Sequence, residues 1–314
     1  MSKSTADRSL KASSGSRTIK TFIEQRQLWL IALPGIIWYA IFAYGPMGGL
    51  LMAFENYSPG RGLLGGPWVG FKWFIQFFQS QFFWRLIRNT LLISIYGIIF
   101  SFPVPIILAI FLNEIRFSGY KRFAQSVSYL PHFISTVVVV GMLANFLAPD
   151  GPVNVIMQKL GGEQKLFMAM PEMFRILYVG SGIWQNAGWN SIIYLAAIAG
   201  INVELYEAAT VDGASRFRQI FTVTLPCILP TIVILLILAV GNLLSVGYEK
   251  IILMYNTATY ETADVIATYV FRRGIGAGEF SFGAAVGMFQ SVFNMIILIS
   301  ANAFSRKVSE TSLW

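Results

Sequence analysis

The fold is decided by a stretch of thirty residues that contains no charged side chain. From position 219 to position 248 it reads QIFTVTLPCILPTIVILLILAVGNLLSVGY. A helix of about 20 apolar residues crosses the roughly 30 Å hydrocarbon core of a bilayer, and a helix satisfies its own backbone hydrogen bonds in lipid. The stretch therefore predicts a transmembrane helix.

Five more uncharged runs of at least 25 residues occur elsewhere in the chain, at 27–54, 89–113, 123–149, 176–203 and 280–305. The next longest gap between charged residues has only 12 residues. Charged side chains make up 12% of the 314 residues, whereas a soluble domain has about 25%, and the alternating pattern of a membrane β-barrel is absent. This composition excludes a disordered chain and argues against a water-soluble enzyme. We predict an all-α, polytopic membrane protein with six transmembrane helices.

A basic N-terminal tail decides the predicted orientation. Residues 1–26 carry six Lys and Arg side chains directly before the first run, and such residues favour the cytoplasmic side of a membrane. Six spans place both termini on that side, where the inner segments hold 13 Lys and Arg and the outer segments hold 10. We predict a cytoplasmic tail at 1–26, a six-helix transmembrane domain at 27–305 and a cytoplasmic C-terminal tail at 306–314. The net charge of +8 suits anionic membrane lipids and requires no nucleic acid.

Three of the predicted spans carry polar and aromatic side chains. Asn186 and Asn190 are four residues apart and share a helix face, and Gln290 and Asn294 repeat that spacing. Polar groups at membrane depth face the bundle interior or a cavity, where they either bond helix to helix or line a pathway for a polar solute. The candidate pathway residues are Trp184, Asn186, Trp189, Asn190, Asn242, Tyr248, Gln290 and Asn294.

The sequence contains no group of residues typical of a catalytic site or a metal site. His132 is the only histidine, and a metal site needs further ligands nearby, so we interpret His132 as an interfacial or packing residue. No acidic residue falls within a predicted span core. An intramembrane lipid-modifying enzyme or protease needs a catalytic set at that depth. We therefore predict no catalytic residue and no metal site, and a transport subunit rather than an enzyme.

The loop at 204–226, directly before the fifth span, is the most informative segment. Its amphipathic start predicts a short helix, and its small residues, Ala208, Ala209, Gly213 and Ala214, let another surface approach closely. Gly213 allows the helix to end and the chain to turn. We expect Phe217 and Phe221, four residues apart, to pack back onto the bundle. From the residues alone, this segment is either a docking helix or a structural connector.

This loop resembles the EAA loop found in permease subunits of ABC importers. The pattern of that loop is Glu-Ala-Ala, three residues, Gly, nine residues, Ile, one residue and Leu-Pro. The chain has Glu207-Ala208-Ala209, Gly213 and Leu225-Pro226 at these spacings, with Val223 in place of the usual Ile. The longer form with Asp212-Gly213-Ala214 is similar to the carbohydrate-importer branch. Segments 130–135, 248–251 and 310–314 also resemble the first permease of importers of complex polysaccharides and oligosaccharides, such as alginate or pectin-derived oligosaccharides.

The resemblance implies a type I importer permease in the inner membrane of a prokaryote, working by alternating access. It implies an ATPase-coupling helix at one end of the loop, built from Glu207, Ala208, Ala209, Asp212 and Gly213. The implied partners are a second, related permease chain, two cytoplasmic ATPase subunits and an extracytoplasmic solute-binding protein. ATP and Mg²⁺ belong to the ATPase, because this chain has no Walker A pattern and no Gly-Lys dipeptide. The chain itself is therefore expected to bind no cofactor.

The sequence does not decide which solute is transported. An importer of a non-sugar solute built on the same loop is the alternative to an oligosaccharide importer. Aromatic faces suit the C–H surfaces of sugar rings, and the spans supply Trp184, Trp189, Tyr194 and Tyr248. Three basic residues on the predicted outer side, Lys250, Arg272 and Arg273, suit an acidic oligosaccharide. They are equally compatible with rim charges or with contacts to the binding protein.

Overall fold

The computed structural model describes residues 25–309 and 312–313. The predicted N-terminal tail therefore lies almost wholly outside the described residues. Within them, all regular secondary structure is helical apart from one isolated β-bridge between Glu55 and Trp68. The prediction of an all-α protein is confirmed.

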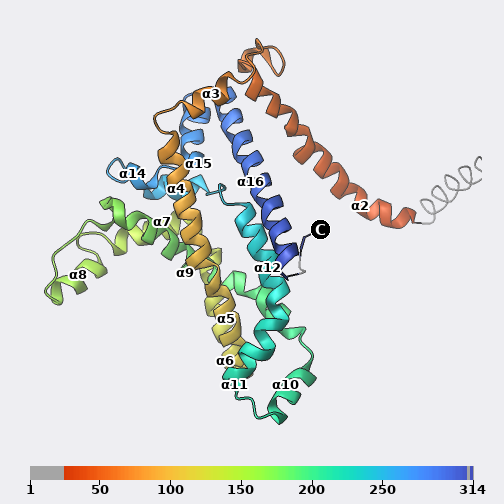
Figure 1. The fold of residues 1–314 in the computed structure, drawn as a ribbon. Helices are drawn as coiled ribbons and strands as arrows, with labels where there is room; N and C mark the ends of the chain where they lie inside the picture. The colour runs from red at the N-terminus through yellow and green to blue at the C-terminus, as the bar shows by residue number, and fades with distance from the viewer. Residues whose placement is uncertain (1–24, 310–311, 314) are drawn as a thin grey trace, which may run out of the picture.

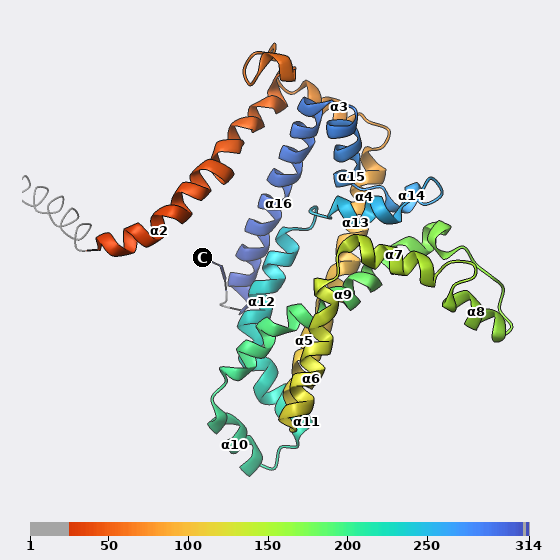
Figure 2. The same cartoon turned by 180° about the vertical axis from the view of Figure 1, so that it is seen from behind.

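The first described element is a long helix that extends away from the rest of the chain (Figures 1 and 2). It consists of α2 (Arg26–Trp38), η1 (Tyr39–Tyr44) and η2 (Gly45–Phe54). Pro34 lies inside α2, and Pro46 lies at the start of the tighter η2 segment. None of the residues of α2 is buried. An apolar helix with this much exposed surface needs lipid or another protein to cover it.

Four elements form the body of the bundle. The second long helix joins α4 (Phe83–Tyr96), η4 (Gly97–Ser101) and α5 (Pro103–Glu114). The others are α9 (Pro171–Ala199), α16 (Phe280–Ser309), and α12 (Leu225–Gly241) with its leading segments α11 (Arg216–Gln219) and η7 (Ile220–Thr224). Helix α5 packs along α9, and α12 packs along α16. Ala109, Tyr194 and Ile228 are buried together where these helices meet.

Two pairs of consecutive helices meet at a sharp bend, one within the predicted span 123–149 and one where the predicted span 176–203 ends. Helix α6 (Ser118–Tyr129), continued by η5 (Leu130–Phe133), meets α7 (Thr136–Phe146) at 97°, and α9 meets α10 (Val203–Val211) at 71°. The first break follows Pro131, and the Ser135 side chain then caps α7 by accepting a hydrogen bond from the Val138 amide. Among the residues that the structure describes, four helices are long and apolar enough to cross a membrane unaided, and counting each bent pair as one span gives up to six, the number predicted.

Short helices lie outside the four long elements, several of them around α4 and the start of α9, with α8 farther out beyond α7 (Figures 1 and 2). They are η3 (Pro59–Arg61), α3 (Lys72–Phe78), α8 (Pro152–Lys159), η6 (Phe167–Ala169), α13 (Tyr248–Met254), α14 (Tyr260–Ala263), α15 (Ile266–Val270) and η8 (Phe271–Gly276). Two buried clusters hold α3, α13, α14 and α15. One contains Ile93, Phe174 and Ile251, and the other contains Phe77 and Phe282. The loop with α10 and α11 lies at the opposite end of the bundle from α3.

Candidate functional site

A polar cavity of about 550 Å³ opens where η4, η5, α9 and α13 meet. Apolar groups such as Ile93 and Phe133 line part of its wall. The polar side chains that line it are Ser101, His132, Ser135, Thr136, Tyr178, Gln185, Asn186 and Lys250. Such a mixture of hydroxyl, amide and aromatic groups suits a solute that carries many hydroxyls.

His132 organises one wall of this cavity. Its Nδ1 lies 3.0 Å from the Asn186 side-chain oxygen, and its ring stacks on Trp189 with centroids 4.6 Å apart and planes within 5°. The Gln185 amide donates to the Ile134 carbonyl at 2.9 Å, so η5 and α9 are fastened together. Our interpretation of His132 as an interfacial or packing residue missed its place in the cavity wall. His132 and Asn186 are 54 positions apart in the sequence, so no regular spacing of residues predicts their contact.

A second, smaller cavity of about 270 Å³ continues the polar surface. Gly97 and Ser101 line both cavities, so the two share a wall on η4. Asn190 and Asn242 line the second cavity, as Asn186 lines the first. The structure thus brings these three predicted amides from α9 and the end of α12 to one polar surface.

The other predicted pathway residues lie elsewhere. Trp184 lines a separate, largely apolar cavity with Val139 and Phe146. Tyr248 stacks on Phe271 with centroids 5.0 Å apart. The amides of two α16 residues hold the turn after α12. Gln290 donates to the Leu244 carbonyl at 2.7 Å, and Asn294 accepts from the Leu244 amide at 3.0 Å and donates to Ser245 Oγ at 2.8 Å. Contact of any of these side chains with a solute stays a prediction.

The predicted coupling residues lie on and just after the exposed helix α10. The Asn202 side chain caps its start by accepting from the Glu204 amide at 3.1 Å. At its end, the Gly213 amide donates to the Thr210 carbonyl and the Ala214 amide to the Ala209 carbonyl, which is the Schellman pattern. Gly213 has a φ of +74°. No residue of α10 is buried, so Glu207, Ala208 and Ala209 belong to a freely accessible helix.

Side-chain contacts connect this helix and the following α11 to neighbouring helices. The Tyr206 hydroxyl lies 2.9 Å from the hydroxyl of Thr224, which is buried at the end of η7, directly before α12. Arg216, just beyond the loop's turn, forms an ion pair with Glu114 at the end of α5, with a separation of 3.3 Å.

The prediction that Phe217 and Phe221 pack onto the bundle is wrong. Their rings contact each other with centroids 5.0 Å apart, but 72% of Phe217 and 56% of Phe221 remain exposed. The spacing of four residues correctly places them on one helix face, but that face points outward. They add an exposed apolar pair beside α10.

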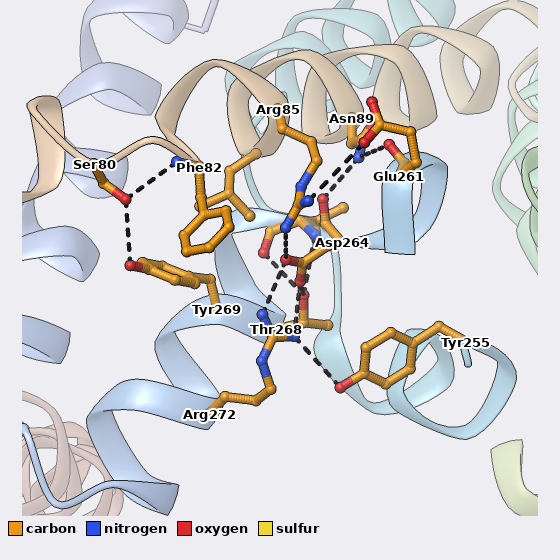
Figure 3. Close-up of polar contacts among 12 residues, drawn as sticks. Ser80, Phe82, Arg85, Asn89, Tyr255, Glu261, Asp264, Thr268, Tyr269 and Arg272 are labelled. Carbon is orange, nitrogen blue, oxygen red and sulfur yellow. Dashed lines mark hydrogen bonds and ion pairs between the residues drawn. The ribbon is translucent and has the colours of Figure 1, made fainter. Parts of the chain in front are cut away.

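A buried ionic cluster lies at the N-terminal end of α4 (Figure 3). The Asp264 carboxylate is fully buried and accepts from Arg272 at 2.8 and 2.9 Å, from Arg85 at 3.2 Å and from the Thr268 hydroxyl at 2.8 Å. The Asn89 amide donates to the Glu261 and Asp264 carbonyls. The cluster joins α4 to the segment that contains α14 and α15.

Comparison with known proteins gives one consistent result. Residues 101–310 match the family described as binding-protein-dependent transport system inner membrane component. The chain is 42% identical over 299 residues to the polygalacturonan/rhamnogalacturonan transport system permease protein YteP of Bacillus subtilis (strain 168), with 95% of this chain and 93% of the relative covered. It resembles a chain of the crystal structure of a bacterial alginate ABC transporter in complex with alginate pentasaccharide-bound periplasmic protein. There the TM-score is 0.85 and the identity 44%, covering 94% of this chain and 99% of the other. A second structure of a bacterial ABC transporter, one involved in the import of the acidic polysaccharide alginate, gives a TM-score of 0.85 at 45% identity, covering 93% and 99%.

The all-α fold and the accessible EAA helix define the class of an ABC importer permease with the type I fold. The chain belongs to the family of inner-membrane components of binding-protein-dependent transport systems. The resemblance that the loop 204–226 carried is confirmed. The predictions of no catalytic residue, no metal and no cofactor remain predictions.

Proposed function

We propose that the chain is one permease of an importer of acidic oligosaccharides derived from uronic-acid polysaccharides. The observation that carries this proposal is the 44% identity and TM-score of 0.85, over 94% of the chain, with a chain of a bacterial alginate ABC transporter. The relative at 42% identity is named for polygalacturonan, which is also a polymer of a uronic acid. The polar cavities supply the hydroxyl, amide and aromatic groups that such a sugar needs.

The pathway that we propose runs through both cavities. Sugar hydroxyls exchange hydrogen bonds with the amides of Asn186, Asn190 and Asn242, which line the shared polar surface. Each such bond contributes only about 1 kcal/mol net. The sugar is therefore held weakly enough to leave on the other side.

Coupling is proposed to take place at α10. Its exposed face, with Glu207, Ala208 and Ala209, seats in a cleft of a cytoplasmic ATPase that carries ATP and Mg²⁺. The contacts from Tyr206 to Thr224 and from Arg216 to Glu114 pass its movement to α12 and α5. Both termini are then cytoplasmic. A second permease, which we propose to be a distinct related chain, two ATPase subunits and an extracytoplasmic binding protein complete the importer.

Uptake into proteoliposomes tests this function. The complex, co-expressed with its partner permease, ATPase and binding protein, is given labelled trigalacturonate, trimannuronate or the neutral maltotriose. We expect ATP-dependent uptake of at least one uronide and little uptake of maltotriose. Uptake of maltotriose alone contradicts an acidic substrate. Uptake of an amino acid or another non-sugar solute in place of all three sugars favours the alternative importer.

A further inference from the structure

We propose that Lys250 binds a carboxylate of the transported oligosaccharide and thereby selects acidic sugars. The inference rests on the proposed import function and adds a specificity-determining residue to it. Lys250 lies on α13 and lines the first polar cavity.

The structure distinguishes Lys250 from Arg272 and Arg273, the other two basic residues that the sequence places on the outer side. Arg272 is held by Asp264 through both terminal nitrogens, and Arg273 forms an ion pair with Glu279 at 2.6 Å. Lys250 forms no ion pair with any residue that the structure describes. Its positive charge is therefore available to a ligand, whereas those of the two arginines are compensated within the chain.

The position of the Lys250 ammonium group is fixed and open to the cavity. Nζ donates to the Tyr178 carbonyl at 3.2 Å and lies 5.1 Å from the centroid of the Tyr178 ring. An ammonium has three N–H donors, so this hydrogen bond uses one of them. Gly182 faces Nζ, and a Cβ at that glycine would lie 3.7 Å from it. The bare glycine leaves room for a ligand group to approach.

The next feature is the lack of other charges around Lys250 in the described cavity lining. Lys250 is the only Asp, Glu, Lys or Arg among the described residues that line the cavity. A cation withdrawn from water without a counter-charge is costly, and a carboxylate that enters the cavity removes that cost. A charge-assisted hydrogen bond is about twice as strong as a neutral one. The remaining lining, including Ser101, Gln185 and Asn186, offers only uncharged polar partners, so the sugar's charge is recognised at one point.

The test compares Lys250→Gln with Lys159→Gln in the full complex. Lys159 is exposed on α8, so its substitution removes the same charge away from the cavity. Initial uptake of the transported uronide is measured in proteoliposomes with saturated binding protein. Equilibrium binding of that uronide and of its carboxyl-reduced form, which keeps rings and linkages, is measured in detergent without binding protein. Co-purification of the partner permease and ATPase reports assembly.

We expect Lys250→Gln to reduce uptake by about tenfold, as befits a lost hydrogen bond to a charged group. Binding of the uronide should weaken similarly, and binding of the carboxyl-reduced sugar should not change. Lys250→Arg should restore most of the preference for the acid, and Lys159→Gln should behave as wild type. The proposal is overturned if Lys250→Gln keeps that preference, or if it releases the partner permease, which would make Lys250 a subunit contact. A wild-type complex that assembles but imports no uronide refutes the proposed function itself.

Discussion

At the residue scale, the end of the coupling helix depends on the backbone of Gly213. Its φ of +74° lies in the left-handed region, which costs a residue with a side chain roughly 1 kcal/mol or more. Space is not the constraint, because a Cβ there would meet nothing within 4 Å. The substitution therefore acts on the backbone turn that ends α10 rather than on packing in the bundle.

We expect Gly213→Val to uncouple transport from ATP hydrolysis without unfolding the bundle. The β-branched residue disfavours the turn, so α10 loses its defined end where the ATPase is proposed to dock. Gly213→Asn is the matched control, because Asn tolerates the left-handed region and should keep most of the uptake. Uptake, ATP hydrolysis and ATPase co-purification are measured together. Normal sugar uptake by Gly213→Val would refute a docking role for this turn.

At the element scale, Asp264 holds α4 to the segment between α13 and η8. Asp264→Asn leaves Arg85 and Arg272 beside each other without their shared counter-charge. Loss of one partner of a buried ion pair costs about 3–5 kcal/mol, but both arginines are about a third exposed, so we expect about 2–3 kcal/mol. The measurement is unfolding of the purified complex in detergent.

Glu279→Gln provides the control for this prediction. It removes one carboxylate from the Arg273 ion pair, in which both side chains are about a third exposed. A pair of this kind contributes less than about 1 kcal/mol. If the two variants lose the same free energy of unfolding, the Asp264 cluster stabilises the attachment of α4 no more than an exposed ion pair does.

The elements also show what the sequence predicts and what it does not. The six spans were predictable because a charge in hydrocarbon is penalised wherever it occurs, so uncharged runs mark the spans locally. The 97° bend within 123–149 was not predicted, because the run carries no charge at the bend and only Pro131 precedes it. The stacking of His132 on Trp189 and the open charge of Lys250 depend on contacts between distant elements. No spacing in the chain encodes those contacts.

At the scale of the whole molecule, the two ends of the bundle predict the topology. The ion pair from Arg216 to Glu114 places the end of α5 and the loop 204–226 on the same side. Reporter fusions after Glu114 and after Glu204 should therefore read cytoplasmic, and a fusion after Asp150 should read external. The basic residues of the tail at 1–26 set which side is which. The reverse pattern, or different readings at Glu114 and Glu204, would contradict the six-span arrangement.

The solute pathway is also a property of the whole molecule. The amide side chains predicted to line it fall into two groups. Asn186, Asn190 and Asn242 line the two cavities that share a wall on η4, whereas Gln290 and Asn294 bond the turn at 244–245. A sugar hydroxyl that loses one amide partner loses about 1 kcal/mol, or roughly fivefold in affinity.

We therefore expect Ala at Asn186, Asn190 or Asn242 to lower uptake several-fold each, and the triple variant to lower it by more than tenfold. Assembly with the ATPase should persist, because an interhelical amide bond contributes only about 1 kcal/mol. Ala at Gln290 or Asn294 serves as the comparison, since both amides bond the turn at 244–245 and line neither cavity. If the triple variant transports normally while the α16 variants do not, the sugar follows α16 instead of the cavities beside η4. If all variants transport normally, these amides only hold helices together, and the pathway lies on the partner permease.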